Sequence, residues 1–203
     1  MSQGASQWRL KSYEEAARLI DLRLKRRPGD LADWHARLDW AVATNRVPLA
    51  QQALKHLSEV ELGSAQIERL AAWFAAQHGD DEAERRNLER LIAVDPTDFT
   101  ALDRLIELLV KSGRIDLAAE QRRRKNDIAQ LQARYRKLFT RNQPRRDAAE
   151  MGRLAEQLGR RFEAKAFLTI ALASTPDRAD IQRDLVRLAK SANSLVESAA
   201  TLQ

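Results

Sequence analysis

The chain of 203 residues contains no cysteine, and this absence excludes disulfide bonds and thiolate metal sites. Glycine and proline are scarce, with 7 and 5 residues, so the sequence supplies few turns for an all-β fold. The first ten residues show no apolar core of a signal peptide, which favours the cytoplasm without identifying the compartment. No stretch approaches the roughly 20 apolar residues that a membrane helix needs, so we expect a soluble chain with no membrane span.

Catalytic patterns are also missing. The histidines His35, His56 and His78 are isolated and form no H-E-x-x-H pair, and the chain has no glycine-rich phosphate loop. The paired acids Asp80 and Asp81 stand where a helix should begin, and there they complement the helix dipole. The sequence therefore predicts no catalytic residue, no metal site and no cofactor, and a protein that is not an enzyme.

The composition favours helices. Hydrophobic residues make up 44% of the chain and charged residues 32%, which is apolar enough for a buried core. Alanine, leucine, arginine, glutamate and glutamine dominate, and these residues are good helix formers. The sequence predicts an all-α protein.

Residues that end helices recur at a fixed interval. Asn45, Gly79 and Gly113 are spaced 34 and 34 residues apart, and Pro28 and Pro96 are twice 34 apart. Asparagine and glycine suit the left-handed backbone conformation that commonly follows the last turn of a helix. The spacing predicts a series of helical hairpins.

This period and the residues that recur with it resemble the tetratricopeptide repeat, a helix–turn–helix unit of 34 residues. The residues that fall in register over roughly 11–176 are Trp34, Ala50, Leu54, Leu102, Leu105, Leu109, Gly113, Ala118, Gly159, Ala164, Leu168, Ala171 and Pro176. The resemblance implies a solenoid of stacked hairpins in a right-handed superhelix, and a protein that binds partners and does not catalyse a reaction.

On this basis the whole chain, 1–203, is predicted to be a single tetratricopeptide-like solenoid domain. Its expected parts are a partial repeat over 1–28, repeats at about 29–62, 63–96, 97–142 and 143–176, and a capping helix over 177–203. The first repeat lacks room for a complete first helix, so we expect Trp8 and Leu10 to be its last turn. We interpret this start as a fragment of a longer protein, with an irregular N-terminal cap as the alternative.

The repeat pattern breaks between Gly113 and Gly159, which are 46 residues apart, or 34 plus 12. No glycine or proline occurs from 114 to 143, so the surplus predicts one extended helix that projects from the stack. The segment 121–146 contains ten basic residues and one acid, Asp127. These residues, called the basic arm below, are Arg122, Arg123, Arg124, Lys125, Arg134, Arg136, Lys137, Arg141, Arg145 and Arg146.

The resemblance also implies a groove lined by the first helices of the hairpins. The positions that map to this predicted groove are His35, Asp39, Arg69, Trp73, Asp103 and Glu107. Burial of Trp73 between hairpins is an equal alternative. The acids at these positions disfavour a ligand that ends in a carboxylate.

The sequence predicts a scaffold that binds a protein or peptide partner through the groove, the basic arm or both. An acidic partner would suit the arm. The alternative is electrostatic binding of nucleic acid by 121–146, because phosphate contacts come from arginine and lysine. Only Tyr135 and Phe139 add aromatic rings to this charge, which makes nucleic acid the weaker hypothesis. A merely solvated basic face is the third possibility.

Overall fold

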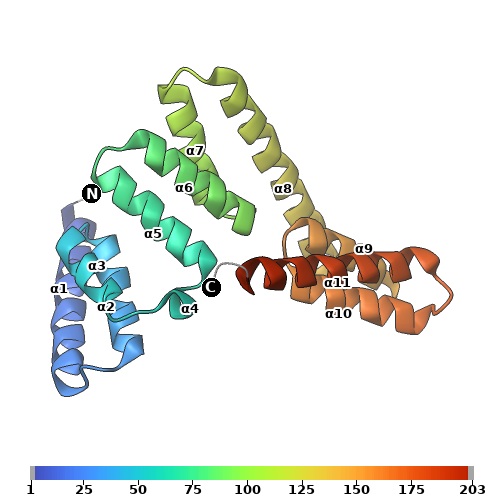
Figure 1. Cartoon of the computed structure of the whole chain (residues 1–203), viewed down its shortest axis with the longest axis horizontal. Helices are drawn as coiled ribbons and strands as arrows, with labels where there is room; N and C mark the ends of the chain where they lie inside the picture. Colours follow the sequence, from blue (N-terminus) through green and yellow to red (C-terminus); the bar gives the residue numbers. More distant parts are fainter. Residues whose placement is uncertain (1–2, 201–203) are drawn as a thin grey trace. The chain divides into compact units, whose positions relative to one another are not determined.

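The computed structural model describes the backbone of residues 3–200 and the side chains of residues 12–190. Within that range the chain is helical and contains no strand, which confirms the predicted all-α class (Figure 1). The helices are α1 (Gln3–Arg26), α2 (Leu31–Ala43), α3 (Val47–Leu54), α4 (Glu59–Leu62), α5 (Ser64–Gln77), α6 (Asp81–Val94), α7 (Phe99–Lys111), α8 (Ile115–Arg141), α9 (Pro144–Gln157), α10 (Arg161–Ser174) and α11 (Ala179–Ala200). None of the helices in the described part is both long and apolar enough to cross a bilayer.

The chain divides into two compact units, residues 1–91 and 92–203. The predicted organisation of 1–203 as one continuous solenoid stays a prediction. The two units are therefore treated separately below.

The hairpins share one turn geometry, and it is the one that the sequence predicts. Asn45, Gly79, Gly113 and Gly159 all have positive φ angles, between 54° and 75°. In each turn the next residue's N–H bonds to a carbonyl five residues back, at 2.7 to 3.0 Å, as in Arg46 to Ala41 and Arg160 to Ala155. This is the Schellman motif, which satisfies the last carbonyls of a helix and reverses the chain. The expected left-handed caps are confirmed.

In unit 1 an apolar cluster joins α1, α2, α3, α5 and the loop after α3. Its buried members are Leu24, Trp34, Leu38, Ala41, Ala50, Ala53, Leu57 and Leu70. The α1–α2 pair is also joined by Arg23 and Asp33, whose Nε and Oδ1 atoms lie 2.7 Å apart. The carboxylate of Asp33 is buried, so this ion pair offsets part of its desolvation.

The start of the chain differs from the sequence prediction. We expected a first helix that ends near Trp8 and Leu10, and the rest of the partial repeat over 1–28 to be a separate helix, but α1 runs without a break from Gln3 to Arg26. No proline or positive-φ residue occurs within it, and the chain there contains only one glycine, Gly4. With nothing to end the first helix, the two predicted segments form one helix.

The second helix of the α2–α3 hairpin is short, because α3 stops at Leu54 after eight residues and the short helix α4 follows. Ser58 and Glu61 start α4 with a capping box. The Ser58 N–H donates to Glu61 Oε2 at 2.7 Å, and the Glu61 N–H donates to the Ser58 hydroxyl at 3.4 Å. This motif satisfies two donors that a helix start otherwise leaves free.

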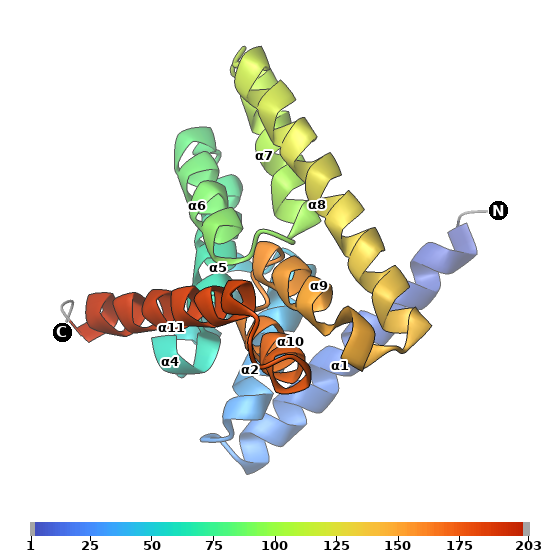
Figure 2. The same cartoon turned by 90° about the vertical axis from the view of Figure 1, so that its right-hand side faces the viewer.

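Unit 2 is organised around α8, which has 27 residues and confirms the predicted extended helix. At about 1.5 Å per residue it is roughly 40 Å long. Helix α1, with 24 residues, is nearly as long. The expectation that α8 projects from the stack does not hold for its C-terminal half, which packs against α9 and α10, while the N-terminal half lies along α7 (Figure 2).

The predicted closing helix is α11, which covers the last hairpin through α10 and α9. Ile181 and Leu188 are buried as expected, and Leu185 is half-buried. The side chains of Ala192 and Leu195 lie outside the described range. Arg153 of α9 ties α11 down with bonds to Asp184 at 2.8 Å and Asp180 at 2.6 Å. Hydrogen bonds from Arg178 and then from Arg153 hold the pKa of Asp180 well below its ordinary value.

Helices α9 and α10 pack closely against each other, and Gly152 makes this possible. A Cβ atom added there would lie 2.6 Å from Leu168 Cγ and 3.2 Å from the Ala164 carbonyl oxygen. Leu168 is fully buried, so it has no room to move away. The equivalent positions, seven residues before the cap, hold Leu38, Ala72 and Ile106 in the other hairpins.

We predict that Gly152→Ala destabilises the α9–α10 hairpin. Overpacking costs about 1–3 kcal/mol, which outweighs the roughly 0.8–1.0 kcal/mol that alanine gains in helix propensity. Gly152→Leu should destabilise it further. Hydrogen exchange of the α9 and α10 amides measures the local stability of this hairpin. A local measurement is needed because the chain has two units, which can unfold separately.

Gly29→Ala is the matched control, because a Cβ at Gly29 meets nothing within 4 Å and its φ is not positive. It should leave exchange in α9 and α10 unchanged. Equal protection in the parent and in Gly152→Leu would contradict the packing described here.

Candidate functional site

One face of α8 is buried and the other carries charge. The buried side chains on α8 are Ala118, Ile128, Tyr135 and Leu138, which recur at helical spacing along its length. The ten cations of the basic arm are exposed except Lys125, which is half-buried. A helix that is buried on one face alone keeps its other face in water. The side chains of the basic arm are therefore accessible to solvent.

Three cations of the arm form ion pairs that attach α8 to its neighbours. Lys125 Nζ lies 2.5 Å from Asp103 Oδ1 on α7, and Arg134 Nε lies 2.5 Å from Glu150 Oε1 on α9. Lys125 also lies over the ring of Phe99, 5.7 Å from its centre. These pairs join α8 to both hairpins of unit 2.

The third pair closes the end of α8. Arg141 donates from Nε to Asp147 Oδ2 at 2.8 Å and from its terminal nitrogen to Oδ1. Asp147 is 4% exposed and lies in the first turn of α9, where the helix dipole favours a negative charge. This two-bond pairing raises the pKa of Arg141. It fixes the turn at Asn142, whose backbone is left-handed with φ 52°.

Six other cations of the arm make no hydrogen bond or ion pair with any described residue. They are Arg122, Arg123, Arg124, Arg136, Lys137 and Arg145, and all six are exposed. We call them the unpaired cations. Arg146 reaches Asp147 only at 4.0 Å. The structure thus divides the predicted arm into cations that hold the fold and cations that face solvent.

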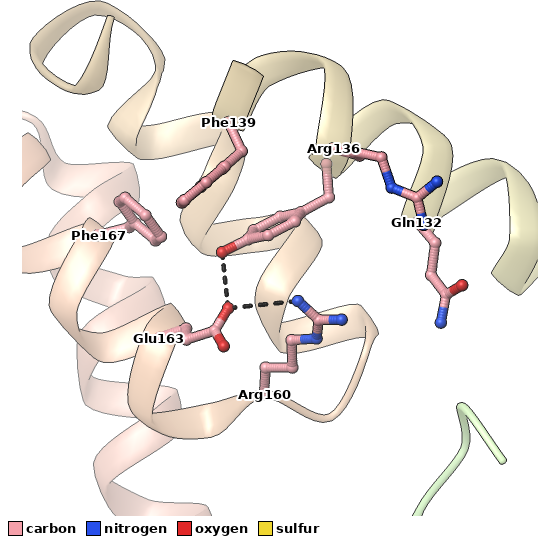
Figure 3. Close-up of a pocket in the computed structure, with 7 residues that line it drawn as sticks. Gln132, Arg136, Phe139, Arg160, Glu163 and Phe167 are labelled. Atoms are coloured by element: carbon pink, nitrogen blue, oxygen red, sulfur yellow. Dashed lines mark hydrogen bonds and ion pairs between the residues drawn. The ribbon is translucent and has the colours of Figure 1, made fainter. Parts of the chain in front are cut away.

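A depression of about 620 Å³ opens between the C-terminal half of α8 and the start of α10. Its lining residues are Gln132, Tyr135, Arg136, Phe139, Arg160, Glu163 and Phe167. Figure 3 shows Phe139 and Phe167 together on one side of it and Arg136 and Gln132 on the other. A second depression of about 330 Å³ shares Phe139 and Phe167 and is also lined by Leu138, Pro144 and Met151. We call the two together the aromatic pocket.

A hydrogen-bonded group fixes the floor of this pocket. The Tyr135 hydroxyl donates to Glu163 Oε2 at 2.6 Å, and Arg160 lies 3.5 Å from the same oxygen (Figure 3). The Arg160 guanidinium also lies over the Tyr135 ring, 5.1 Å from its centre. Burial, followed by the bond to Glu163 and its negative charge, raises the pKa of Tyr135 to about 12.

The residues of the predicted groove differ in how far they are exposed to solvent. In unit 1, Asp39 and Arg69 are exposed and His35 is half-buried. Trp73 is half-buried, packs against the apolar cluster and meets Phe74 edge-on at 4.9 Å. The assignment of Trp73 to a groove stays a prediction. The structure shows that Trp73 also packs inside unit 1.

In unit 2 the two predicted groove acids are already paired. Asp103 binds Lys125 of the arm, so the structure joins two residues that the sequence assigned to different sites. Glu107 is exposed and pairs with Arg104 on the same helix at 3.1 Å.

The histidines have local roles. His56 stacks on Trp34 with ring centres 3.7 Å apart, and His78 Nδ1 lies 2.7 Å from the Phe74 carbonyl oxygen. Among the described residues, no three side chains of His, Asp or Glu come together as metal ligands would.

The sequence did not identify the aromatic pocket as a site. Tyr135 and Phe139 were noted only as aromatic neighbours of the charge, and Arg160, Glu163 and Phe167 were not considered. An available signal was the single-turn spacing of Tyr135 and Phe139 on a helix that must pack on the next hairpin.

No model of a protein family matches the sequence, and no curated protein matches it. Among solved structures, the chain is similar to the crystal structure of PilW, a widely conserved type IV pilus biogenesis factor. The two share 18% sequence identity with a TM-score of 0.42, over 98% of this chain and 88% of that one. A similarity of that size identifies neither a function nor a partner for this chain.

We predict that Glu163→Gln lowers the pKa of Tyr135 from about 12 toward, but not to, its ordinary value near 10. The substitution removes the negative charge and leaves the burial. Because the raised pKa favours the neutral phenol in the folded state, its contribution to stability is complete below about pH 10 and is lost as the pH rises through about 12. Absorbance titration of the two tyrosines measures the change.

Tyr135→Phe assigns the late step in that titration, because only Tyr13 then remains. Identical titration curves for the parent and Glu163→Gln would show that the hydroxyl does not bond to Glu163 in solution.

Proposed function

We propose that this chain is a non-catalytic protein-binding scaffold of the tetratricopeptide-like kind, and that α8 presents its unpaired cations to an acidic surface of a partner protein. The observation that carries the proposal is the division of the arm. Lys125, Arg134 and Arg141 hold α8 against α7 and α9. The six unpaired cations have no such role among the described residues.

None of these six cations forms an ion pair with a described residue. Arg122, Arg123 and Arg124 are consecutive, so three positive charges lie within a single turn of α8. A cluster of one sign attracts an acidic surface. Charges at the rim of an interface mainly raise the association rate and the salt dependence of binding, so a positive surface suits capture of an acidic partner.

Nucleic acid is the competing ligand for a basic helix. It would bind mainly through phosphates, and its affinity would fall steeply with salt for unrelated sequences. Ring faces for base stacking are few here, because Tyr135 is 8% exposed and its ring is covered by Arg160. We therefore favour protein over nucleic acid and include nuclease in the test.

We predict that reversing Arg122, Arg123 and Arg124 to glutamate removes a partner that the parent retrieves from native extract. Nuclease treatment should leave that partner in place, because the contact is between proteins. The measurement is affinity capture with the full chain, compared by quantitative mass spectrometry. The fold should persist, because these side chains are exposed and make no bond to a described residue.

The matched control reverses Arg18, Lys55 and Arg86, three exposed cations outside the arm. It changes the net charge equally and should retain the partner. If nuclease releases everything that depends on the arm, the ligand is nucleic acid and the proposal fails. If the arm variant and the control retrieve the same proteins, the arm does not bind a partner.

The predicted groove is a second surface of the same proposed scaffold. We predict that Trp73→Ala weakens a partner held there by about 2 kcal/mol or more, the size typical of a buried aromatic hot spot. Since Trp73 also packs on the apolar cluster, the helical signal of the variant is measured alongside its affinity. Trp73→Phe keeps a ring at this position and is the control. Unchanged affinity in a folded Trp73→Ala chain would place the binding site elsewhere.

A further inference from the structure

We infer that the aromatic pocket binds a short peptide segment in which a large apolar side chain, aromatic or aliphatic, is flanked by acidic residues. This inference rests on the proposed function, because it names the chemical class of the partner that the basic arm would hold. It also moves the site away from the predicted groove. The larger depression is built by α8 and α10, the second helices of their hairpins, and α9 adds Pro144 and Met151 to the smaller one, whereas the groove positions lie on α2, α5 and α7.

The shape of the pocket fits a side chain. The larger depression, about 620 Å³, lies within the range of roughly 300–1,000 Å³ found for ligand sites. Phe139 is 64% exposed at the junction of the two depressions, although it is one of the larger apolar residues of the chain. An apolar group that fills the depression would cover this ring and remove it from water.

The floor of the pocket is rigid enough to be selective. Tyr135 is held by its bond to Glu163 and packs edge-on against Phe167, with ring centres 6.3 Å apart. Glu163 also holds Arg160, so the one carboxylate of the lining is already engaged. A partner side chain therefore meets preorganised rings, which lowers the entropy lost on binding.

The charges around the pocket select acidic neighbours for that side chain. Arg136 lines the larger depression, is exposed and pairs with no described residue. Arg145 is exposed at the start of α9, next to Pro144 of the smaller depression. With Glu163 engaged, the cations Arg136 and Arg145 remain for an incoming carboxylate.

The lining favours a peptide over a nucleic acid base. Leu138, Pro144 and Met151 make the smaller depression aliphatic and concave. Stacked bases need flat, open ring faces, and Phe139 is the one strongly exposed ring of this lining. A branched or aromatic amino-acid side chain fills such a shape more completely.

The test is selection of a random peptide library displayed on phage against the full chain, with the Phe139→Ala chain as the counter-selection. We expect enriched sequences with one large apolar residue flanked by aspartate or glutamate. Peptides synthesised from the consensus should bind the parent roughly thirty-fold more tightly than Phe139→Ala, as for a hot-spot ring. Arg136→Glu should also weaken binding.

Two variants are matched controls for these changes. Phe162 is 88% exposed and does not line the pocket, so Phe162→Ala removes an equivalent ring and should leave the affinity unchanged. Lys137→Glu reverses an exposed charge next to Arg136 in the sequence but outside the lining, and should weaken binding less than Arg136→Glu at physiological salt.

Three other outcomes overturn the inference in distinguishable ways. Acidic peptides that bind the parent and Phe139→Ala equally would leave the proposed function standing without the pocket. Enriched peptides with no acidic preference would contradict both. A short oligothymidylate that displaces the peptides and loses affinity in Phe139→Ala would identify single-stranded nucleic acid as the ligand and would also contradict both.

Discussion

Unit 2 depends on the burial of one face of α8 along its length. The first half of that face lies on α7 and the second half on α9 and α10, so a single helix belongs to two successive hairpins. A helix that serves two neighbours in this way must be longer than one that pairs with a single helix. The burial also leaves the rest of α8 in water, and five of the six unpaired cations lie there, with Arg145 at the start of α9.

The acids of the neighbouring helices decide which cations are available to a partner. Each of three acids forms an ion pair with one cation of α8: Asp103 with Lys125, Glu150 with Arg134, and Asp147 with Arg141. Asp147 is the strongest constraint, because its carboxylate is buried and would lose its two-bond partner if Arg141 were removed, with only Arg146 at 4.0 Å remaining. The remaining positive charge is therefore not spread evenly along α8. It is concentrated at 122–124 and again near the aromatic pocket.

The contrast between the ordinary hairpins and α8 indicates how this chain combines repetition with a specific site. The repeated turns at Asn45, Gly79, Gly113 and Gly159 give the hairpins a common geometry. The C-terminal half of the long helix α8 forms one wall of the depression, and α10 forms the other. The candidate site thus lies where the repeat pattern is interrupted. Gly152 lets the neighbouring helices α9 and α10 pack closely.

Local chemistry made part of this structure predictable. The 34-residue spacing of asparagine and glycine identified the turns, because a left-handed cap requires those residues wherever it occurs. The lack of a breaker after Gly113 predicted the length of α8 for an equally local reason. The Ser58–Glu61 capping box was a local signal that the sequence analysis did not use, and the unbroken course of α1 differs from the expected end of a helix near Leu10. The single solenoid and the groove stay predictions.

By itself, then, the sequence determined the helices, their turns and the total charge of the arm, since each of these depends on residues within a few positions of one another. Only the tertiary structure decided which cations are paired and which rings form a pocket. Asp103 and Lys125 are 22 residues apart, Arg134 and Glu150 are 16 apart, and Tyr135 meets Glu163 across 28. Contacts over such distances are set by how the hairpins pack, and in a chain of irregular repeats the sequence period does not specify that packing.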